Sequence, residues 1–182
     1  NDAVSRVAIQ RGALQFFPPE ILGAHIGPAP AHTTGRSQSL NFRAGVALPG
    51  HLGIETDVRH LDAEQRAALK QWIALYKELR ERLHHGRVWC GVAGDGVVWQ
   101  LHADAAVEEA IVFVYRLTPT SHRYTPPLRL PMLNGAWRYR IQRLDPTPPD
   151  WTSSPLNDAL FGAADVQGHG TWLAEAGLPL PR

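Results

Sequence analysis

The chain has 182 residues, of which 44% are hydrophobic and 19% charged, so it has enough apolar side chains to form a core. Its 18 basic and 17 acidic side chains leave a formal charge of only +1, which argues against a nucleic-acid or membrane-surface binder that acts through bulk charge. The single cysteine, Cys90, excludes an internal disulfide and a zinc site built from several cysteines. No apolar run approaches the ~20 residues of a bilayer span, so no membrane partner is expected.

The only methionine is Met132, and the sequence opens directly into a helical pattern. We therefore expect the chain to be an internal or C-terminal piece of a longer protein, with any targeting segment upstream. The 15 prolines and 16 glycines predict many loops and a chain that is partly β.

The first half of the chain is predicted to be mostly helical. Apolar residues at three- and four-residue spacings predict a helix over residues 2–17, which Pro18-Pro19 ends. The apolar run over residues 21–26 is too short for a helix and is bounded by turn residues, which predicts a strand buried on both faces. A turn-rich loop follows, and residues 37–48 predict a second helix.

The strongest helical signal covers residues 63–83. Asp62 and Gln65 have the spacing of a capping box, and Gly86 is a plausible stop. We expect its apolar face to pack inward and to anchor the first half of the chain to the second. That face consists of Leu69, Trp72, Ile73, Tyr76, Leu79 and Leu83.

After Gly86 the apolar period changes to two, which predicts strands. Gly94-Asp95-Gly96 between two such runs predicts a hairpin. A proline-rich stretch over residues 146–155 precedes the last predicted strand. The predicted strands cover residues 88–92, 97–101, 107–117, 137–141 and 171–174. Several strands separated by turn signals are typical of a β-sandwich.

The alternation of strand and helix in the first half is typical of the end of a βα repeat array. Because such an array needs more than one strand, we expect the other strands to precede this chain. The fold class predicted from the residues is therefore α/β followed by an all-β, antiparallel part.

The densest group of candidate functional residues lies between residues 23 and 36, at the carboxyl end of the predicted strand. In βα barrels, functional loops gather at that end. His25 and His32 could hydrogen-bond a polar ligand, and Arg36 could orient a carboxylate. The structural alternative is that His25 is a satisfied core histidine and that Arg36 clamps a loop.

Other candidate sites have weaker support. His84, His85 and His102 could suggest a metal, but no spacing matches a recognised ligand motif, so no metal is expected. Cys90 lies in a strand with apolar neighbours, which favours an inert, buried thiol.

Arg138, Arg140 and Arg143 form a basic stripe next to Trp137 and Tyr139. Single-stranded nucleic acid binds to surfaces that combine positive charge with aromatic rings. Strand alternation places the aromatic rings on the face opposite Arg138 and Arg140, so the stripe is interpreted as an outer sandwich face. No nucleic-acid partner is expected.

No complete catalytic set is visible. Glu20, Glu55 and Asp57 have no partner arrangement that their spacing reveals, and there is no glycine-rich phosphate loop.

Five ordered motifs nevertheless resemble the α-galactosidases (melibiases) of glycoside hydrolase family thirty-six. The resemblance is close over residues 1–90 and looser through the second half. The motifs are FFPPEILGAHIG at 16–27, HTTGR at 32–36, FRA at 42–44, GHLGIE at 50–55 and WIALYK at 72–77.

The resemblance implies a (β/α)₈ TIM barrel followed by a C-terminal antiparallel β-sandwich. Residues 1–83 would be the end of the barrel, with strand eight over residues 21–26, and residues 84–182 a sandwich truncated at its end. It also implies retaining hydrolysis by two aspartates about 5 Å apart. Both are expected upstream of Asn1, and Asp2 corresponds to neither, so the fragment itself is expected to be inactive.

The resemblance further implies a ligand, an α-galactoside oligosaccharide of the melibiose or raffinose type, with no cofactor. His25, His32 and Arg36 would then lie at the rim of the substrate pocket or just behind it. A cytoplasmic location of the bacterial type is expected, and a homo-oligomer remains open. The alternatives are a non-catalytic carbohydrate-binding or structural β-sandwich module, or a related galactosyltransferase.

Overall fold

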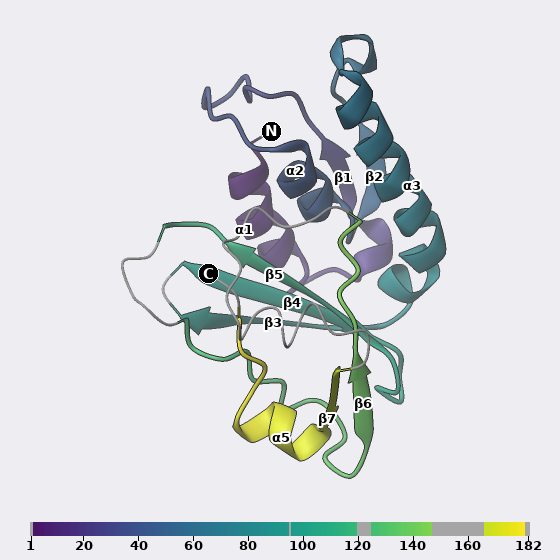
Figure 1. Ribbon diagram of the computed structural model, residues 1–182, viewed down its shortest axis with the longest axis vertical. Helices are drawn as coiled ribbons and strands as arrows, with labels where there is room; N and C mark the ends of the chain where they lie inside the picture. The colour runs from purple at the N-terminus through teal and green to yellow at the C-terminus, as the bar shows by residue number, and fades with distance from the viewer. Residues whose placement is uncertain (1, 95, 120–124, 147–165, 181–182) are drawn as a thin grey trace.

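The computed structural model describes residues 2–94, 96–119, 125–146 and 166–180 (Figure 1). The first part of the chain alternates helices and strands: α1 (Ala3–Ala13), β1 (Gly23–Ile26), α2 (Leu40–Ala47), β2 (His51–Ile54) and α3 (Ala63–His84), with 3-10 turns η1 (Pro19–Ile21) and η2 (Val58–His60). The second part contains β3 (Arg87–Gly94), β4 (Val97–Ala103), β5 (Ala110–Arg116), β6 (Arg138–Ile141), β7 (Val166–His169) and α5 (Gly170–Glu175).

Helix α1 begins where the sequence predicts it but ends earlier. The Asp2 carboxylate caps its first turn by accepting a hydrogen bond from the Val4 backbone N–H at 2.7 Å. The helix ends at Ala13 rather than at residue 17, and Phe16 and Phe17 are exposed. These two rings are not part of the core of the described residues. The helix predicted from the apolar pattern was therefore too long.

Strand β1 differs from its prediction in length and in burial. It begins at Gly23, because the residues up to Ile21 form η1. Ala24 and Ile26 are fully buried, whereas Gly23 and His25 are exposed on the other face. The prediction of a strand buried on both faces is therefore wrong for the described residues. Alternation of this kind is what a strand with one covered face shows.

A second strand, β2, was not predicted. It pairs in parallel with β1, with Ala24 opposite Leu52 and His25 opposite Gly53. Helix α2, which the sequence placed over residues 37–48, connects the two strands, and Ser39 caps it. Strand β1 is therefore followed by another parallel strand, and its assignment as strand eight, the last of a barrel, is wrong.

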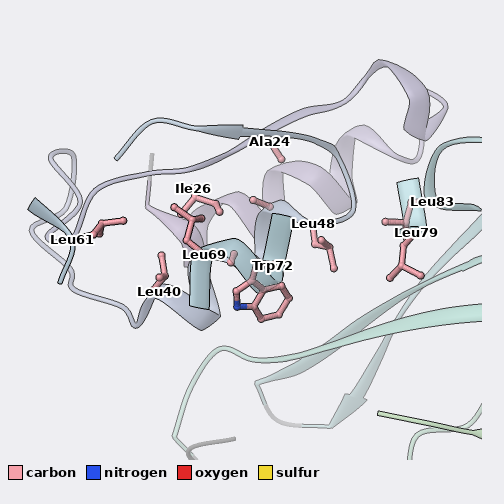
Figure 2. Close-up of a cluster of buried hydrophobic side chains, with 11 residues drawn as sticks. Ala24, Ile26, Leu40, Leu48, Leu61, Leu69, Trp72, Leu79 and Leu83 are labelled. Atoms are coloured by element: carbon pink, nitrogen blue, oxygen red, sulfur yellow. The ribbon is translucent and has the colours of Figure 1, made fainter. Parts of the chain in front are cut away.

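Helix α3 confirms its prediction, with one residue added at its end. Both hydrogen bonds of the Asp62–Gln65 capping box are present. The Trp72 ring is 3% exposed, and its Nε1–H donates to Asn41 Oδ1 at 3.0 Å. Figure 2 shows Trp72 among the side chains that fill the space between α2, α3 and the β1–β2 sheet. The inward apolar face is formed by Leu69, Trp72, Leu79 and Leu83, with Ile73 and Tyr76 partly buried beside them.

The predicted hairpin is confirmed as β3 and β4, and β5 completes an antiparallel sheet in the order β3–β4–β5. Asp95, in the middle of the turn, lies outside the described residues. Strand β5 covers residues 110–116 and is shorter than the predicted strand over residues 107–117. Almost every residue of the central strand β4 is buried. This sheet lies between the helices α1–α3 and the unit formed by β6, β7 and α5 (Figure 1).

The face of the sheet toward the helices shares a core with the first part of the chain. Ile111 and Phe113 of β5 pack against the cluster that contains Trp72 and Leu83. Tyr115 packs with Val7 of α1 and Val46 of α2. The expected domain boundary after residue 83 stays a prediction, because two hydrophobic clusters cross it.

The opposite face of the sheet is covered by β6, β7 and α5. Trp99 and Leu101 of β4 pack with Leu128 and Leu173, and Tyr139 and Ile141 of β6 lie against the same cluster. Strand β6 pairs with β7, so the predicted strand at residues 137–141 is confirmed with a slightly later start. As predicted, the exposed Arg138 and Arg140 lie on the other side of β6 from Tyr139.

The predicted strand at residues 171–174 is wrong, because these residues belong to helix α5. The last strand is β7, at residues 166–169. Leu173 is buried within the helix. Gly177, which follows the C-cap residue Ala176, has φ +84°, a conformation that favours glycine at the end of a helix. Residues 147–155 of the proline-rich stretch and the last two residues of the chain lie outside the described residues.

The described residues thus form a βα part followed by antiparallel sheets of three and two strands. Among the described helices, none combines the length and the apolar character that a transmembrane segment needs. Cys90 is exposed, so the expectation of a buried thiol is wrong. It lies on strand β3, opposite Gln100 of β4, and next to Gly91, whose carbonyl accepts a hydrogen bond from Arg11 of α1 at 2.9 Å.

Candidate functional site

His25 lies near the carboxyl end of β1, on the face of the β1–β2 sheet that points away from the helical core. Its imidazole ring rests directly on Gly53 of β2, where a Cβ atom would collide with ring atoms Cδ2 and Nε2. Glycine at this position therefore allows the ring to lie flat against the neighbouring strand. Because His25 is exposed, the alternative of a satisfied core histidine does not apply in the described residues.

The loop after β1 is held by hydrogen bonds from Arg43 of α2. Arg43 is 7% exposed, and its guanidinium donates from Nη1 to the Gly27 carbonyl and from Nε to the Gln38 carbonyl, the latter at 3.1 Å. Burial lowers the pKa of Arg43. Both ends of the loop that carries His32 and Arg36 are thus tied to one buried cation.

Within the loop, the chain turns back on itself. The Ala31 carbonyl accepts a hydrogen bond from the Gly35 N–H at 2.7 Å, and the Arg36 carbonyl accepts one from the Ala31 N–H at 2.9 Å. Gly35 has φ +69°, in the left-handed region that favours glycine. This closed turn places Thr34 and Arg36 near the start of α1.

The Asp2 carboxylate joins this loop to helix α1. Its Oδ2 accepts hydrogen bonds from Thr34 Oγ1 at 2.6 Å and from Arg36 Nη1 at 2.8 Å, while Oδ1 caps the helix. The Asp2 side chain is 1% exposed and that of Arg36 is 45% exposed. Burial raises the pKa of Asp2, but the hydrogen bonds from Thr34, Val4 and Ser5 and the charge of Arg36 outweigh it and hold the pKa below its usual range.

Two consequences follow for the chemistry. Both oxygens of Asp2 are already occupied, so this carboxylate is built to hold the loop rather than to exchange protons with a ligand. Arg36 is clamped at one nitrogen, as the structural interpretation expects, while about half of its side chain still faces solvent. An arginine held in this way offers its remaining N–H groups in a fixed orientation.

The structure brings together only some of the residues that the sequence proposed. Arg36 contacts Asp2 and Thr34, whereas no described contact joins His25 or His32 to Arg36. His32 is exposed in the same loop. Sequence reasoning missed Thr34 and Gly53, although both lie inside the quoted motifs: Thr34 within the HTTGR segment and Gly53 within GHLGIE.

The proposed histidine cluster is divided between two environments. His84 is 6% exposed and faces His51, with ring centroids 4.2 Å apart, while His102 is 1% exposed and contacts the Leu83 carbonyl through Nδ1 at 2.8 Å. His85 is exposed near Glu81. Across the described ranges, no three histidine, cysteine or acidic side chains are grouped so that they could hold a metal ion.

Comparison with known proteins places this geometry in a family. Residues 1–86 match the family model described as Melibiase. An α-galactosidase from Escherichia coli is 32% identical over 196 residues, an alignment that covers 100% of this chain and 26% of the relative. The chain is therefore a melibiase homologue. It spans about a quarter of the length of that relative and matches a fragment of it.

Solved structures of family GH36 share the fold of this melibiase homologue. The GH36 α-galactosidase AgaB from Geobacillus stearothermophilus has a TM-score of 0.80 and 27% identity, covering 100% of this chain and 22% of its own. A variant of AgaA from the same organism, in complex with stachyose, also has a TM-score of 0.80 and 27% identity, over 100% of this chain and 23% of its own.

Proposed function

We propose that this melibiase homologue forms the C-terminal part of a retaining α-galactosidase, which removes terminal α-linked galactose from oligosaccharides of the melibiose and raffinose type. The observation that carries the proposal is the match of the whole chain, in sequence and in fold, to a fragment of α-galactosidases, one of which is solved with stachyose. In this proposal β1 and β2 are neighbouring strands of a (β/α)₈ barrel, and the antiparallel sheets belong to its C-terminal sandwich.

Retaining hydrolysis needs two carboxyl groups, one that protonates the leaving oxygen and one that attacks the anomeric carbon. Asp2 is poorly suited to either role, because Thr34, Arg36 and the start of α1 occupy both of its oxygens. Asp57 is bound to the Arg59 guanidinium at 2.7 Å. We propose that the catalytic aspartates are supplied by chain upstream of Asn1, and that the 182-residue chain alone does not turn over.

His25, His32 and Arg36 would line the rim of the substrate pocket. Support for His25 comes from its position, since it faces away from the helices at the carboxyl end of a parallel strand. In a closed barrel that side is the interior, and active sites lie at the carboxyl ends of the strands. Support for Arg36 comes from its anchoring by Asp2, which leaves part of the guanidinium exposed, so that its other N–H groups can donate hydrogen bonds to the hydroxyl oxygens of a sugar.

The test is release of nitrophenol from a nitrophenyl α-galactoside by the purified chain, beside the chain that carries Asp2→Asn. No turnover is expected from either. Turnover that disappears with Asp2→Asn would make Asp2 a catalytic residue and refute the assignment. In a longer protein that includes this chain, the same assay is expected to show α-galactosidase activity, and its absence there would contradict the proposed function itself.

A further inference from the structure

A pocket is formed by β6, β7 and the start of α5. These elements lie on the side of the central sheet that faces away from β1 and β2 (Figure 1). The pocket is a shallow hollow that opens to solvent, with a volume of about 530 Å³. Its lining comes from β6, β7 and the first turn of α5, and consists of Arg138, Gln167, Gly168, His169 and Trp172. None of these residues takes part in the loop held by Asp2, so the pocket is separate from the candidate site described above.

Trp172 gives this pocket an aromatic wall. Its side chain is 39% exposed, whereas Trp72 and Trp99 are buried in the two main clusters. The six-membered part of the indole lies against Gly168, where a Cβ atom would be 2.9 Å from Cε3. The next residue, Leu173, is 2% exposed and fixes α5 to the core. The exposed ring is therefore held in place by packing on one side and is open on the other.

The remaining described lining is polar, and none of these described residues is acidic. Arg138 and His169 lie opposite each other in the β6–β7 pair, and both are exposed. Gln167, two residues before His169, brings an amide that both donates and accepts hydrogen bonds. The wall thus combines one aromatic ring with several hydrogen-bonding groups within a single small pocket.

We propose that this pocket is a second carbohydrate-binding site, which takes one ring of an uncharged oligosaccharide. A sugar ring has an apolar face of C–H groups, whose positive edge suits the negative face of an indole. Its hydroxyl oxygens can accept hydrogen bonds from the Arg138 guanidinium. The inference goes beyond the proposed function, because binding here needs no catalytic carboxylate.

Single-stranded nucleic acid fits the same surface less well. Such binding uses successive aromatic rings along a basic groove. Here Tyr139 and Ile141 point into the core on the other side of β6, so Trp172 is the aromatic residue among those that line the pocket. The indole of Trp172 alone can stack on one sugar ring, whereas a strand of bases would need several aromatic rings in succession.

The experiment is a titration of the full 182-residue chain with stachyose, in which binding is measured by tryptophan fluorescence and by calorimetry. We expect a dissociation constant on the order of 1 mM. Trp172→Ala and Arg138→Ala should each weaken binding at least about tenfold, whereas Trp172→Tyr, which keeps an aromatic wall, should restore most of it. Arg140→Ala is the matched control, because Arg140 is exposed on the same strand but does not line the pocket. Unchanged thermal unfolding of each variant shows that the fold is kept.

Three outcomes would overturn the inference. The first is no binding of stachyose, and the second is equal binding by the chain and by Trp172→Ala. The third is tight binding of an oligothymidylate that weakens steeply with added salt, which would make the pocket a nucleic-acid site. His25→Ala separates this inference from the proposed function: binding that is lost with His25→Ala but kept with Trp172→Ala places the sugar at β1 and refutes only the second site.

Discussion

We expect the fold to lose stability in mild acid, and the largest contribution to come from the buried histidine His102. Its Nδ1 lies 2.8 Å from the Leu83 carbonyl oxygen, and its Nε2 lies 2.7 Å from Gln100 Nε2. The neutral ring satisfies both contacts when Nδ1–H donates to Leu83 and Nε2 accepts from the Gln100 amide. A protonated ring would carry a second N–H, which would face the amide hydrogens of Gln100.

Burial lowers the pKa of His102 to about 4; the hydrogen bond to Leu83 opposes that shift, and nearby His84 adds to it. In the unfolded chain the group titrates near its ordinary value of 6.5. Between these two values the unfolded state holds the proton and the folded state does not. The contribution of His102 to the free energy of unfolding should therefore be complete above about pH 6.5. The free energy of unfolding should fall by about 3 kcal/mol as the pH drops toward 4.

The assay is urea unfolding at a series of pH values between 7 and 4, for the chain and for His102→Gln. The variant removes this titration, so its free energy of unfolding should fall less steeply over the same window, although it starts lower because a buried contact is lost. His85→Gln, at an exposed neighbouring histidine, is the control and should keep the steep fall. Equal slopes for the chain and for His102→Gln would refute the reasoning.

Three further predictions concern the core and the candidate site. Trp72→Ala should lower the free energy of unfolding by roughly 3–5 kcal/mol in urea, since the ring is buried, and an unchanged midpoint would contradict the packing of α3. Asp2→Asn keeps a helix cap but removes the charge that holds the loop, so a loss of roughly 1–3 kcal/mol is expected, against no measurable change for the exposed Asp57→Asn. Gly53→Ala should displace the ring of His25, seen as a shift of its imidazole resonances with little change in thermal unfolding.

The sequence predicted best those elements whose local signals agree. Helix α3 carries a capping box, a long apolar face and a stop, so three independent cues indicate the same element. The hairpin of β3 and β4 is likewise marked by its turn glycines and by alternation on both sides. In both cases the information lies within about twenty residues of the chain, and tertiary packing strengthens what is already encoded locally.

The misses share a different cause, which is dependence on distant partners. Strand β2 has four residues, two of them His51 and Gly53, and it becomes a strand because β1 pairs with it. Residues 171–174 contain threonine and tryptophan, which favour strands, but burial of Leu173 against the central sheet selects a helix. Cys90 is exposed on β3, which has only one neighbouring strand in the described sheet, and no local pattern records that position.

The candidate site shows the same division. The sequence placed His25, His32 and Arg36 at the carboxyl end of one strand and in the loop behind it. The structure has His25 within β1 and the other two in the loop that follows. The contact that orients the loop, between Arg36 and Asp2, joins residues 34 positions apart in the chain. Spacing alone cannot reveal such a pair, because it depends on where α1 lies relative to the loop.

The antiparallel part of the chain is built into the support of this loop. Tyr115 of β5 is 6% exposed, packs against Val7 and Val46, and donates from its hydroxyl to the Gly45 carbonyl of α2 at 3.4 Å. Helix α2 in turn supplies Arg43, which holds the loop after β1. A β-module that worked alone would expose the side of β5 that carries Ile111, Phe113 and Tyr115. It would lose the free energy gained by burying these apolar side chains against the helices. The central sheet therefore supports α2 and the candidate site, which favours a β part that is integral with the βα part over an independent β-module.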